Sequence, residues 1–266
     1  MAAHVASGWE SILFASGEES VAIGQRLGVP YLRAQQEELC VNLGGDVPIL
    51  TVHQCSMGLA AISGVVWDCG LLLVDFLIWE SDRGISGTKG RVLDLGTGTG
   101  ICGLAALVLG ASHVTFTDIN EPPSFVDNLQ QLSPDLRQRV VFVAYDWSST
   151  TIDSRLATPP HTEETNLTLD EPDNQAAREC WDTVLCSDLL YDEKAHQTLI
   201  NTMQKVAFKR AVFAYKKRHD APERAFFLQL ETFCDLQVMS PNEIPLQNVT
   251  STSLPGLFVV IATKKL

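Results

Sequence analysis

The sequence predicts an α/β protein built on a mixed seven-stranded sheet, and three observations lead to that prediction. Residues 92–110 contain a short apolar strand, a turn with alternating glycines and an Ala- and Leu-rich helix. Apolar strand-like and helical segments then alternate along residues 114–233, as in α/β sheets. Two closing strands, 236–239 and 257–263, are joined by a loop that contains Pro and Asn. Such an antiparallel pair indicates a mixed, Rossmann-like sheet flanked by helices.

The glycine turn is the centre of the predicted site. Gly96, Gly98 and Gly100 follow Asp94 in the pattern D-x-G-x-G-x-G. Glycines let the backbone approach a ligand that a Cβ would exclude, and the start of the next helix offers unpaired N–H groups. The alternative is a turn that only joins a strand to a helix, which would leave three costly glycines without a purpose.

The register of the acid decides between two nucleotide ligands. Gly98, Gly100 and Gly103 match the dinucleotide pattern G-x-G-x-x-G, which favours a nicotinamide-dependent dehydrogenase. Asp94 would repel phosphate, however, and suits a cationic ligand with an amino-acid end, held directly or through water. S-adenosylmethionine is such a ligand, because it carries a sulfonium, an α-ammonium and a ribose but no phosphate. We therefore predict S-adenosylmethionine as the cofactor.

Composition narrows the class of partner. The chain has 266 residues, a net charge of −13 and a pI near 4.8, which argues against binding to nucleic acid or acidic membranes. The charge is compatible with a lysine-bearing protein surface, although solubility alone explains it equally well. Seven cysteines without a C-x-x-C pair indicate reduced thiols, and scattered histidines give little support for a metal site. With neither a signal peptide nor a membrane span recognised, we expect a cytoplasmic protein, with the nucleus as a second compartment.

The segment before the glycine turn predicts a strand and a helix. Residues 48–54 alternate as a strand does, and residues 65–80 have helical spacing, with Trp67, Leu71 and Ile78 on one face. Trp67 has two interpretations of equal weight. It is either a core residue or a flat apolar wall at the mouth of the glycine site.

Acidic side chains follow three further strands. Asp118, about twenty residues beyond the glycines, is placed to accept hydrogen bonds from both ribose hydroxyls. Asp146 and Trp147 suit an adenine pocket, in which the acid accepts from the exocyclic amine and the indole covers the ring. The alternatives are a helix cap at Asp118 and a surface acid beside a packing tryptophan at 146–147.

A third strand, Val184 to Cys186, leads into Asp188 and Tyr191. Ligands bind at the carboxyl ends of parallel strands, so both residues are expected beside the glycine site. A carboxylate can hold an amine, and a tyrosine ring can flank a cation. Alternatively, Asp188 caps the next helix and Tyr191 packs beneath it.

With these residues assembled, the chain resembles the class I seven-β-strand methyltransferases, and among them the methyltransferase family 16 group of protein-lysine methyltransferases. Four segments carry the resemblance: GVVWDCGLLLVDFL, VLDLGTGTGICGLAALVLGA, FTDIN and SDLLY. It implies cofactor contacts at Trp67, Gly96, Thr97, Gly98, Asp118, Trp147 and Ser187, and a lysine pocket lined by Asp188 and Tyr191. The family often has Glu at position 94 and Ala at position 187; the residues here keep the charge or the size.

The resemblance also implies a domain division and a substrate class. Residues 1–48 are predicted as an N-terminal extension packed on the core, and residues 49–266 as the methyltransferase domain. Residues 148–180, which are polar and acid-rich, form a predicted surface insertion. Family members act on valosin-containing protein, chaperones and elongation factors, so the resemblance implies a protein substrate such as a chaperone or translation factor. We expect a monomer.

The predicted reaction is methyl transfer to a lysine amine, with Asp188 orienting the amine and Tyr191 lining its channel. Positioning supplies much of the rate of such a displacement, and burial near a sulfonium helps lysine to lose its proton. Two alternatives remain at this point. One is a small-molecule N-methyltransferase of the same fold, and the other is a non-catalytic binding module on this scaffold.

Overall fold

The computed structural model describes residues 8–13, 33, 36–55, 61–85, 89–159, 180–250 and 253–265. Its main sheet has seven strands in the order β5-β4-β3-β6-β7-β9-β8. These strands are β3 (Arg91–Leu95), β4 (His113–Asp118), β5 (Val140–Ala144), β6 (Trp181–Ser187), β7 (Phe208–Lys216), β8 (Cys234–Met239) and β9 (Leu257–Lys264). The first five are parallel, and β9 pairs antiparallel with both β7 and β8. The predicted mixed seven-stranded sheet is therefore confirmed.

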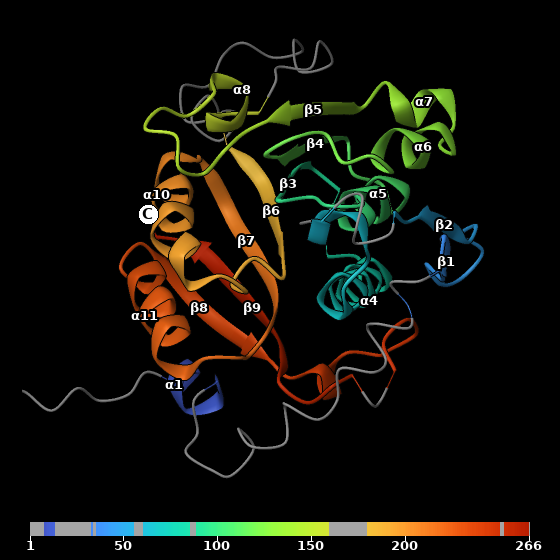
Figure 1. Ribbon diagram of the computed structural model, residues 1–266. Coiled ribbons are helices and arrows are strands. Elements are labelled where there is room, and N and C mark those ends of the chain that lie inside the picture. The colour runs from blue at the N-terminus through green and yellow to red at the C-terminus, as the bar shows by residue number, and fades with distance from the viewer. Residues whose placement is uncertain are drawn as a thin grey trace, which may run out of the picture.

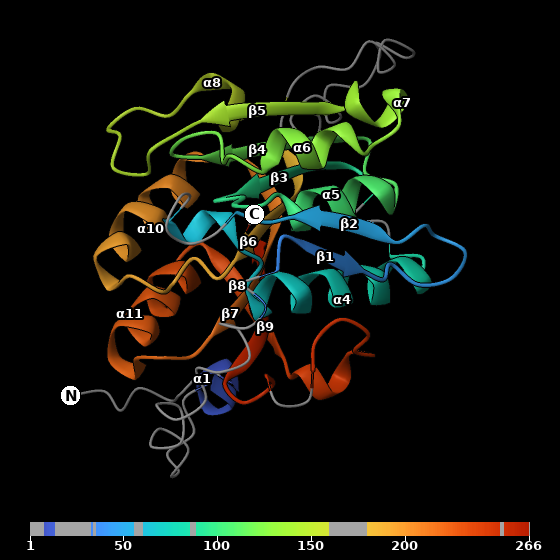
Figure 2. The ribbon, with the colours of Figure 1, turned by 45° about the vertical axis from the view of Figure 1, so that its right-hand side comes forward.

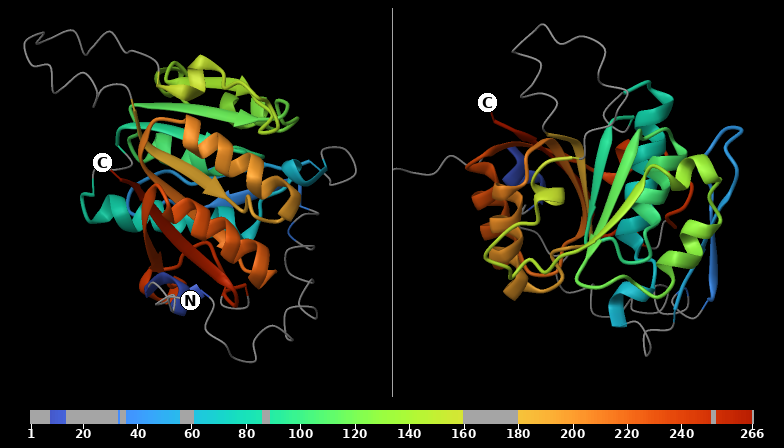
Figure 3. Two further views of the ribbon diagram at one scale, coloured as in Figure 1. Left: turned by 90° about the vertical axis from the view of Figure 1, so that its left-hand side faces the viewer. Right: turned by 90° about the horizontal axis from the view of Figure 1, so that it is seen from above.

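Helices cover both faces of this sheet (Figure 1; Figure 3). One face carries α4 (Asp68–Asp82) and α5 (Ile101–Val108), with α6 (Phe125–Gln130) and α7 (Pro134–Arg137) towards the β5 edge. The other face carries α10 (His196–Lys205), preceded by the 3-10 turn η6 (Glu193–Ala195), and α11 (Asp220–Glu231). Two short elements, α8 (Ser154–Ala157) and η7 (Pro241–Glu243), lie in connections.

Two apolar cores fill the spaces between the sheet and its helices. Because side chains alternate along a strand, Val92 and Leu93 of β3 enter different cores. Val92 packs with α4 and α5, and Leu93 packs with α10 and α11. Burial on both faces explains why the central strands are continuous apolar runs in the sequence.

A second, two-stranded sheet lies outside the α4 and α5 layer (Figure 2). It pairs β1 (Glu38–Val41) with β2 (Leu50–His53) antiparallel, an arrangement that the sequence did not predict. Asn128 of α6 joins this sheet to the glycine turn. Its amide oxygen accepts from the His53 N–H at 2.6 Å, and its amide nitrogen donates to the carbonyls of His53 and Thr99 at 3.2 and 2.9 Å.

The N-terminal helix α1 (Gly8–Leu13) lies beside β8 and α11 (Figure 2). The Trp9 ring lies 6.0 Å from that of Phe227, and its N–H donates to Glu231 at 2.8 Å. The division into an extension and a methyltransferase domain stays a prediction.

The longest apolar segment is a core element. Ile62–Asp82 has the length and the mean hydropathy, 1.8, of a membrane-spanning helix, but 78% of its apolar window is buried inside the protein. Its first turns are not α-helical, since residues 61–64 form the 3-10 turn η3 (Ala61–Gly64) and α4 begins only at Asp68. The predicted helix over 65–80 therefore starts too early, and Trp67 is its N-cap.

The acidic segment enters the structure in part. Of residues 148–180, the range 160–179 lies outside the described residues. The portion before it is ordered against the core, because Leu156 is buried and its carbonyl accepts from the indole N–H of Trp181 at 2.9 Å. At the other end, β6 begins at Trp181, three residues before the predicted strand.

Candidate functional site

The glycine turn between β3 and α5 is closely surrounded. Gly96, Gly98 and Gly100 have φ of +66°, +53° and +85°, the left-handed region that favours glycine. A Cβ on Gly96 would lie 2.7 Å from Leu189 and 3.1 Å from the Trp147 ring. A Cβ on Gly98 would lie 3.2 Å from the carbonyl oxygen of Ser63. The turn thus follows a path that side chains would block.

Asp94 supports this turn from inside. One of its carboxylate oxygens accepts from the Thr97 hydroxyl at 2.6 Å and from the Gly103 N–H at 3.0 Å. The Asp94 side chain is 1% exposed, and its two hydrogen bonds join it to the glycine turn and to α5. Burial raises the pKa of Asp94 to about 7, the two hydrogen bonds oppose the rise, and the charge of Asp118 adds to it.

Asp118 ends β4 directly beside the turn. One carboxylate oxygen accepts from the Gly98 N–H at 2.9 Å, and the other accepts from the Ile119 N–H at 2.8 Å. Each oxygen has a second lone pair, so the carboxylate can still accept from two further donors. Burial raises the pKa of Asp118, and the two N–H donors oppose that rise. The next side chain, Ile119, is 60% exposed at the same edge.

Trp147 and Asp146 follow β5 and differ in their surroundings. The half-buried Trp147 ring borders Gly96. Asp146 is exposed, and one of its oxygens accepts from the Ser148 N–H at 2.8 Å. That hydrogen bond lowers the pKa of Asp146. The structure therefore brings Trp147 to the turn, whereas Asp146 forms a local turn of its own.

Trp67 and Ser187 complete the predicted cofactor contacts. Trp67 is half-buried, and its indole N–H donates to the Ile62 carbonyl at 3.0 Å, which ties the start of α4 to η3. Ser187 is the last residue of β6, and its hydroxyl would lie 3.5 Å from a Cβ built on Gly70. Since Ser63 of η3 contacts Gly98, η3 connects Trp67 to the glycine turn.

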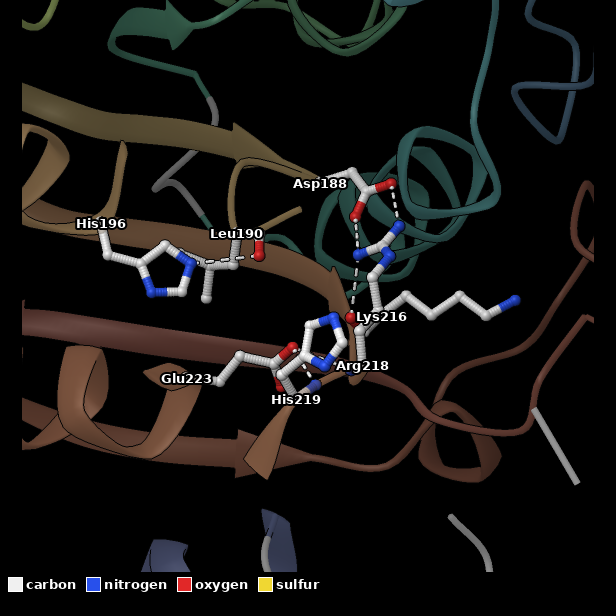
Figure 4. A network of polar contacts seen from close by, with 7 residues as sticks. All are labelled: Asp188, Leu190, His196, Lys216, Arg218, His219 and Glu223. Carbon is white, nitrogen blue, oxygen red and sulfur yellow. Dashed lines mark hydrogen bonds and ion pairs between the residues drawn. The ribbon is translucent and has the colours of Figure 1, made fainter. Parts of the chain in front are cut away.

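Asp188 is bound by an arginine that sequence reasoning did not pair with it. The two terminal nitrogens of Arg218 donate to the two carboxylate oxygens of Asp188, each at 2.8 Å (Figure 4). Asp188 is 8% exposed. Among the described residues it is the non-glycine residue with a positive φ, +54°, and its N–H donates to the Ala214 carbonyl at 2.8 Å. Asp188 does not cap the following 3-10 turn, whose N-cap is Asp192.

Tyr191 follows Asp188 by three residues in the loop after β6. It is 49% exposed and so does not pack beneath the next helix. Burial and the negative charges of Asp118, Asp192 and Asp188 raise the pKa of Tyr191. The Tyr191 hydroxyl is therefore within the electrostatic influence of both Asp118 and Asp188.

His196 holds the loop that carries Asp188 and Tyr191 from the opposite side. One ring nitrogen lies 3.1 Å from the Leu190 carbonyl oxygen (Figure 4). The other lies 3.3 Å from the carbonyl oxygen of Pro222. Sequence reasoning missed Arg218, His196, Ser63 and Leu189. The signal for Arg218 was the basic run KKR directly after a strand that neighbours the one before Asp188.

No group of three or more His, Cys, Asp or Glu residues within the described ranges is placed to hold a metal ion. Four of the cysteines, Cys69, Cys102, Cys186 and Cys234, are buried. Burial raises the pKa of each of these thiols.

The mixed sheet, with a glycine turn after β3 and acids at the ends of neighbouring strands, defines an α/β protein whose candidate site lies at the carboxyl ends of its parallel strands. Comparison with protein families makes this specific, because the lysine methyltransferase family matches residues 46–162 and 160–233. The chain belongs to this family of S-adenosylmethionine-dependent protein-lysine methyltransferases.

Individual relatives are more distant. The chain is 29% identical over 148 residues to the protein N-lysine methyltransferase METTL21A of Danio rerio, covering 55% of this chain and 56% of that protein. It is 24% identical over 173 residues to the protein N-terminal and lysine N-methyltransferase EFM7 of Candida albicans, covering 65% and 58%. The matched part thus spans little more than half the length of these curated relatives.

Among solved structures, the magnesium protoporphyrin IX methyltransferase of Synechocystis PCC 6803 with bound SAM is similar with a TM-score of 0.48 and 17% identity. The similarity covers 74% of this chain and 80% of that one.

Proposed function

We propose that this chain transfers a methyl group from S-adenosylmethionine to the side-chain amine of a lysine in a protein substrate. Membership of the lysine methyltransferase family supports the reaction class. The single observation that supports the cofactor site is the glycine turn, whose left-handed backbone is fixed by Asp94 from inside and by Asp118 from the edge.

The donor set fits this cofactor. The glycines allow the left-handed path of the turn and leave its backbone without side chains, which the close approach of a ligand to a backbone requires. Asp118 retains lone pairs at the sheet edge, as two ribose hydroxyls require. Trp147, which borders Gly96, and the exposed Ile119, which follows Asp118, provide apolar surface of the kind that suits an adenine ring.

The remaining predicted contacts have supporting positions. Thr97 donates its hydroxyl to Asp94, so both residues shape the turn. We assign Ser187 to the cofactor side through its backbone at the end of β6, and Trp67 to the mouth beside η3. We assign Asp146 to the adenine amine as predicted, since one of its oxygens accepts from the Ser148 N–H and the exposed carboxylate retains lone pairs for a further donor.

The amine end is assigned to Asp188 and Tyr191. When bound, the cofactor supplies an already activated methyl on a sulfonium, so the protein needs to position a neutral amine in line with it. Asp188 orients that amine, and the half-exposed Tyr191 ring lines its approach. The raised pKa of Tyr191 keeps its hydroxyl protonated at neutral pH, so the ring adds no charge beside the amine.

Two measurements test this function. The purified chain is incubated with tritiated S-adenosylmethionine and a cell extract, and the labelled lysine is located by mass spectrometry. Calorimetry with S-adenosylhomocysteine measures cofactor affinity separately. The expected result is a labelled lysine and measurable binding. Binding without label transfer to any protein would favour the small-molecule methyltransferase, and the absence of binding would overturn the proposal.

We also propose a substrate class, an oligomeric state and a compartment for this enzyme. Chaperones and translation factors are the first substrates to test, because the family resemblance implies them. The net charge of −13 is compatible with a basic protein partner. We further propose a monomeric, cytoplasmic enzyme, which sedimentation and localisation experiments would examine.

A further inference from the structure

Arg218 occupies a position that affects the charge of the bound amine. It follows β7, and Asp188 follows β6, two parallel strands paired at Ser187 and Ala214. The chain therefore leaves both strands at the same edge of the sheet, and the two side chains meet there in a two-point ion pair (Figure 4).

The arginine is held by contacts other than this pair. One terminal nitrogen also donates to the Lys216 carbonyl at 3.0 Å. Glu223 of α11 accepts from the backbone N–H groups of Arg218 and His219 at 2.8 and 2.9 Å (Figure 4). Glu223 is 1% exposed, so this clamp is an interior feature. The guanidinium is thus held by the Lys216 carbonyl of β7, and the backbone of Arg218 by Glu223 of α11.

Two other titratable groups, the Cys69 thiol and the Tyr191 hydroxyl, are influenced by the charge of Asp188. His219 follows Arg218, and its backbone N–H is bound by Glu223. The Cys69 thiol reaches Asp188 from α4, and the Asp188 charge helps to raise the pKa of that thiol. Tyr191 lies on the same loop, and the charges of Asp118, Asp192 and Asp188 all act on it. The Lys216 side chain extends away from the carboxylate (Figure 4). Arg218 is therefore the cation that opposes the charge of Asp188 within this described part of the site.

An unopposed carboxylate would favour the ammonium form of a bound lysine, since an opposite charge stabilises the charged state. An ammonium has no lone pair and cannot accept a methyl group. The reaction needs the proton released to solvent first, after which the nitrogen lone pair forms the C–N bond as the C–S bond breaks. A neutralised carboxylate can orient the amine without holding that proton.

We propose that Arg218 is a positioning residue that neutralises Asp188, so that the substrate lysine is oriented by this acid yet enters the reaction as a free amine. The inference rests on the proposed lysine methyltransferase function. Glu223 supports it indirectly by fixing the backbone of Arg218.

Two matched variants separate charge from structure. Arg218→Gln keeps a hydrogen-bond donor but removes the charge, whereas Arg218→Lys keeps the charge. The probe is the protein that wild-type enzyme labels most strongly in an extract, and kcat is measured against pH. In Arg218→Gln the rising limb of the profile should move to higher pH by about one unit, which lowers kcat on that limb about tenfold. Arg218→Lys should keep the wild-type position of the limb.

A second readout needs no cofactor. Ultraviolet difference titration, with Tyr191→Phe subtracted, gives the pKa of Tyr191. It should rise further in Arg218→Gln and stay near the wild-type value in Arg218→Lys, because only the former leaves Asp188 unopposed. Melting curves and S-adenosylhomocysteine affinity confirm folding, and Arg218→Met replaces Arg218→Gln if the latter unfolds.

The outcomes are distinguishable. If the wild type is active and its pH profile coincides with that of Arg218→Gln, this inference is overturned and the proposed function is left intact. A wild type that binds cofactor but labels no lysine would overturn both.

Discussion

The carboxylate of Asp188 and the guanidinium of Arg218 face each other across the ends of β6 and β7, with both oxygens engaged at 2.8 Å. The acid assigned to the substrate amine is therefore part of a fixed pair. It also has a positive φ, which for a residue other than glycine stores backbone strain. Strain of this kind clusters at functional sites, which agrees with the assignment.

Replacing Asp188 with Ala should separate catalysis from cofactor binding. We expect kcat to fall about a hundredfold or more, because the amine loses its orienting group, a loss of roughly 3 kcal/mol or more in transition-state stabilisation. Affinity for S-adenosylhomocysteine, measured by calorimetry, should stay within about threefold of wild type, because Asp188 is assigned to the substrate amine and not to the cofactor. The control is Asp192→Ala, which removes an exposed acid that accepts from the Lys194 N–H. Turnover that survives in Asp188→Ala would contradict the assignment.

Replacing Gly98 with Arg should abolish cofactor binding. The new side chain would start 3.2 Å from the Ser63 carbonyl oxygen and fill the approach to the turn. We expect the affinity for S-adenosylhomocysteine to fall about a hundredfold or more.

The matched control for that variant is Gly84→Arg. Gly84 has a similar positive φ, +68°, but nothing lies within 4 Å of its would-be Cβ. It therefore carries the backbone strain without the obstruction. Equal loss of binding in both variants would show that strain, and not occupation of the turn, is responsible.

Replacing Asp118 with Asn should weaken cofactor binding more moderately. The amide has one oxygen in place of two, so it cannot accept from the Gly98 and Ile119 N–H groups and from two hydroxyls as well. Hydrogen bonds to charged groups contribute about 1.5–3 kcal/mol, which corresponds to a loss of affinity of roughly 10- to 100-fold. Calorimetry measures it, with Asp235→Asn on the exposed edge strand β8 as the control. An unchanged dissociation constant would remove Asp118 from the site.

Asp94 should make stability fall as pH rises. Its carboxyl is protonated up to a pKa of about 7 in the folded chain, whereas the unfolded chain releases that proton near pH 4. Between these values the folded state binds more protons, so the free energy of unfolding decreases with increasing pH.

Asn at position 94 lacks this titration. The free energy of unfolding of Asp94→Asn, relative to wild type, should therefore rise by on the order of 2 kcal/mol between about pH 5 and pH 8. Urea denaturation at several pH values measures the difference. Parallel stability curves would show that Asp94 is ionised throughout this range.

Much of the fold follows from local patterns. The strand, glycine turn and helix at β3 and α5 are recognisable because burial on both sides makes the strand continuously apolar and the turn needs left-handed glycines. The alternation of residues 48–54 also predicts a strand, and β2 forms within that range. Its partner β1 and their antiparallel pairing are not recognisable in this way, since the pairing depends on a loop and the small sheet lies against α6. The start of α4 was misplaced because Val65 and Val66, which lie between η3 and α4, extend the apolar run of the helix towards its N-terminus.

The site residues likewise divide into those that local sequence patterns predict and those that only the arrangement of the elements reveals. Those that follow strands, such as Asp118 and Asp188, can be predicted because the ends of parallel strands converge. The partners that these residues contact on other elements cannot be predicted in this way. The pairing of Asp188 with Arg218 joins residues thirty positions apart, and it required the order of β6 and β7 in the sheet.

The three hydrogen bonds of Asn128 carry an evolutionary consequence. One side chain must donate twice and accept once to hold the small outer sheet on the glycine turn. Aspartate cannot donate, and leucine, the nearest apolar match in size, can do neither. A change of Asn128 to aspartate or leucine would therefore break part of the connection between the small sheet and the glycine turn. A change at the exposed Val126 of the same helix would leave that connection in place.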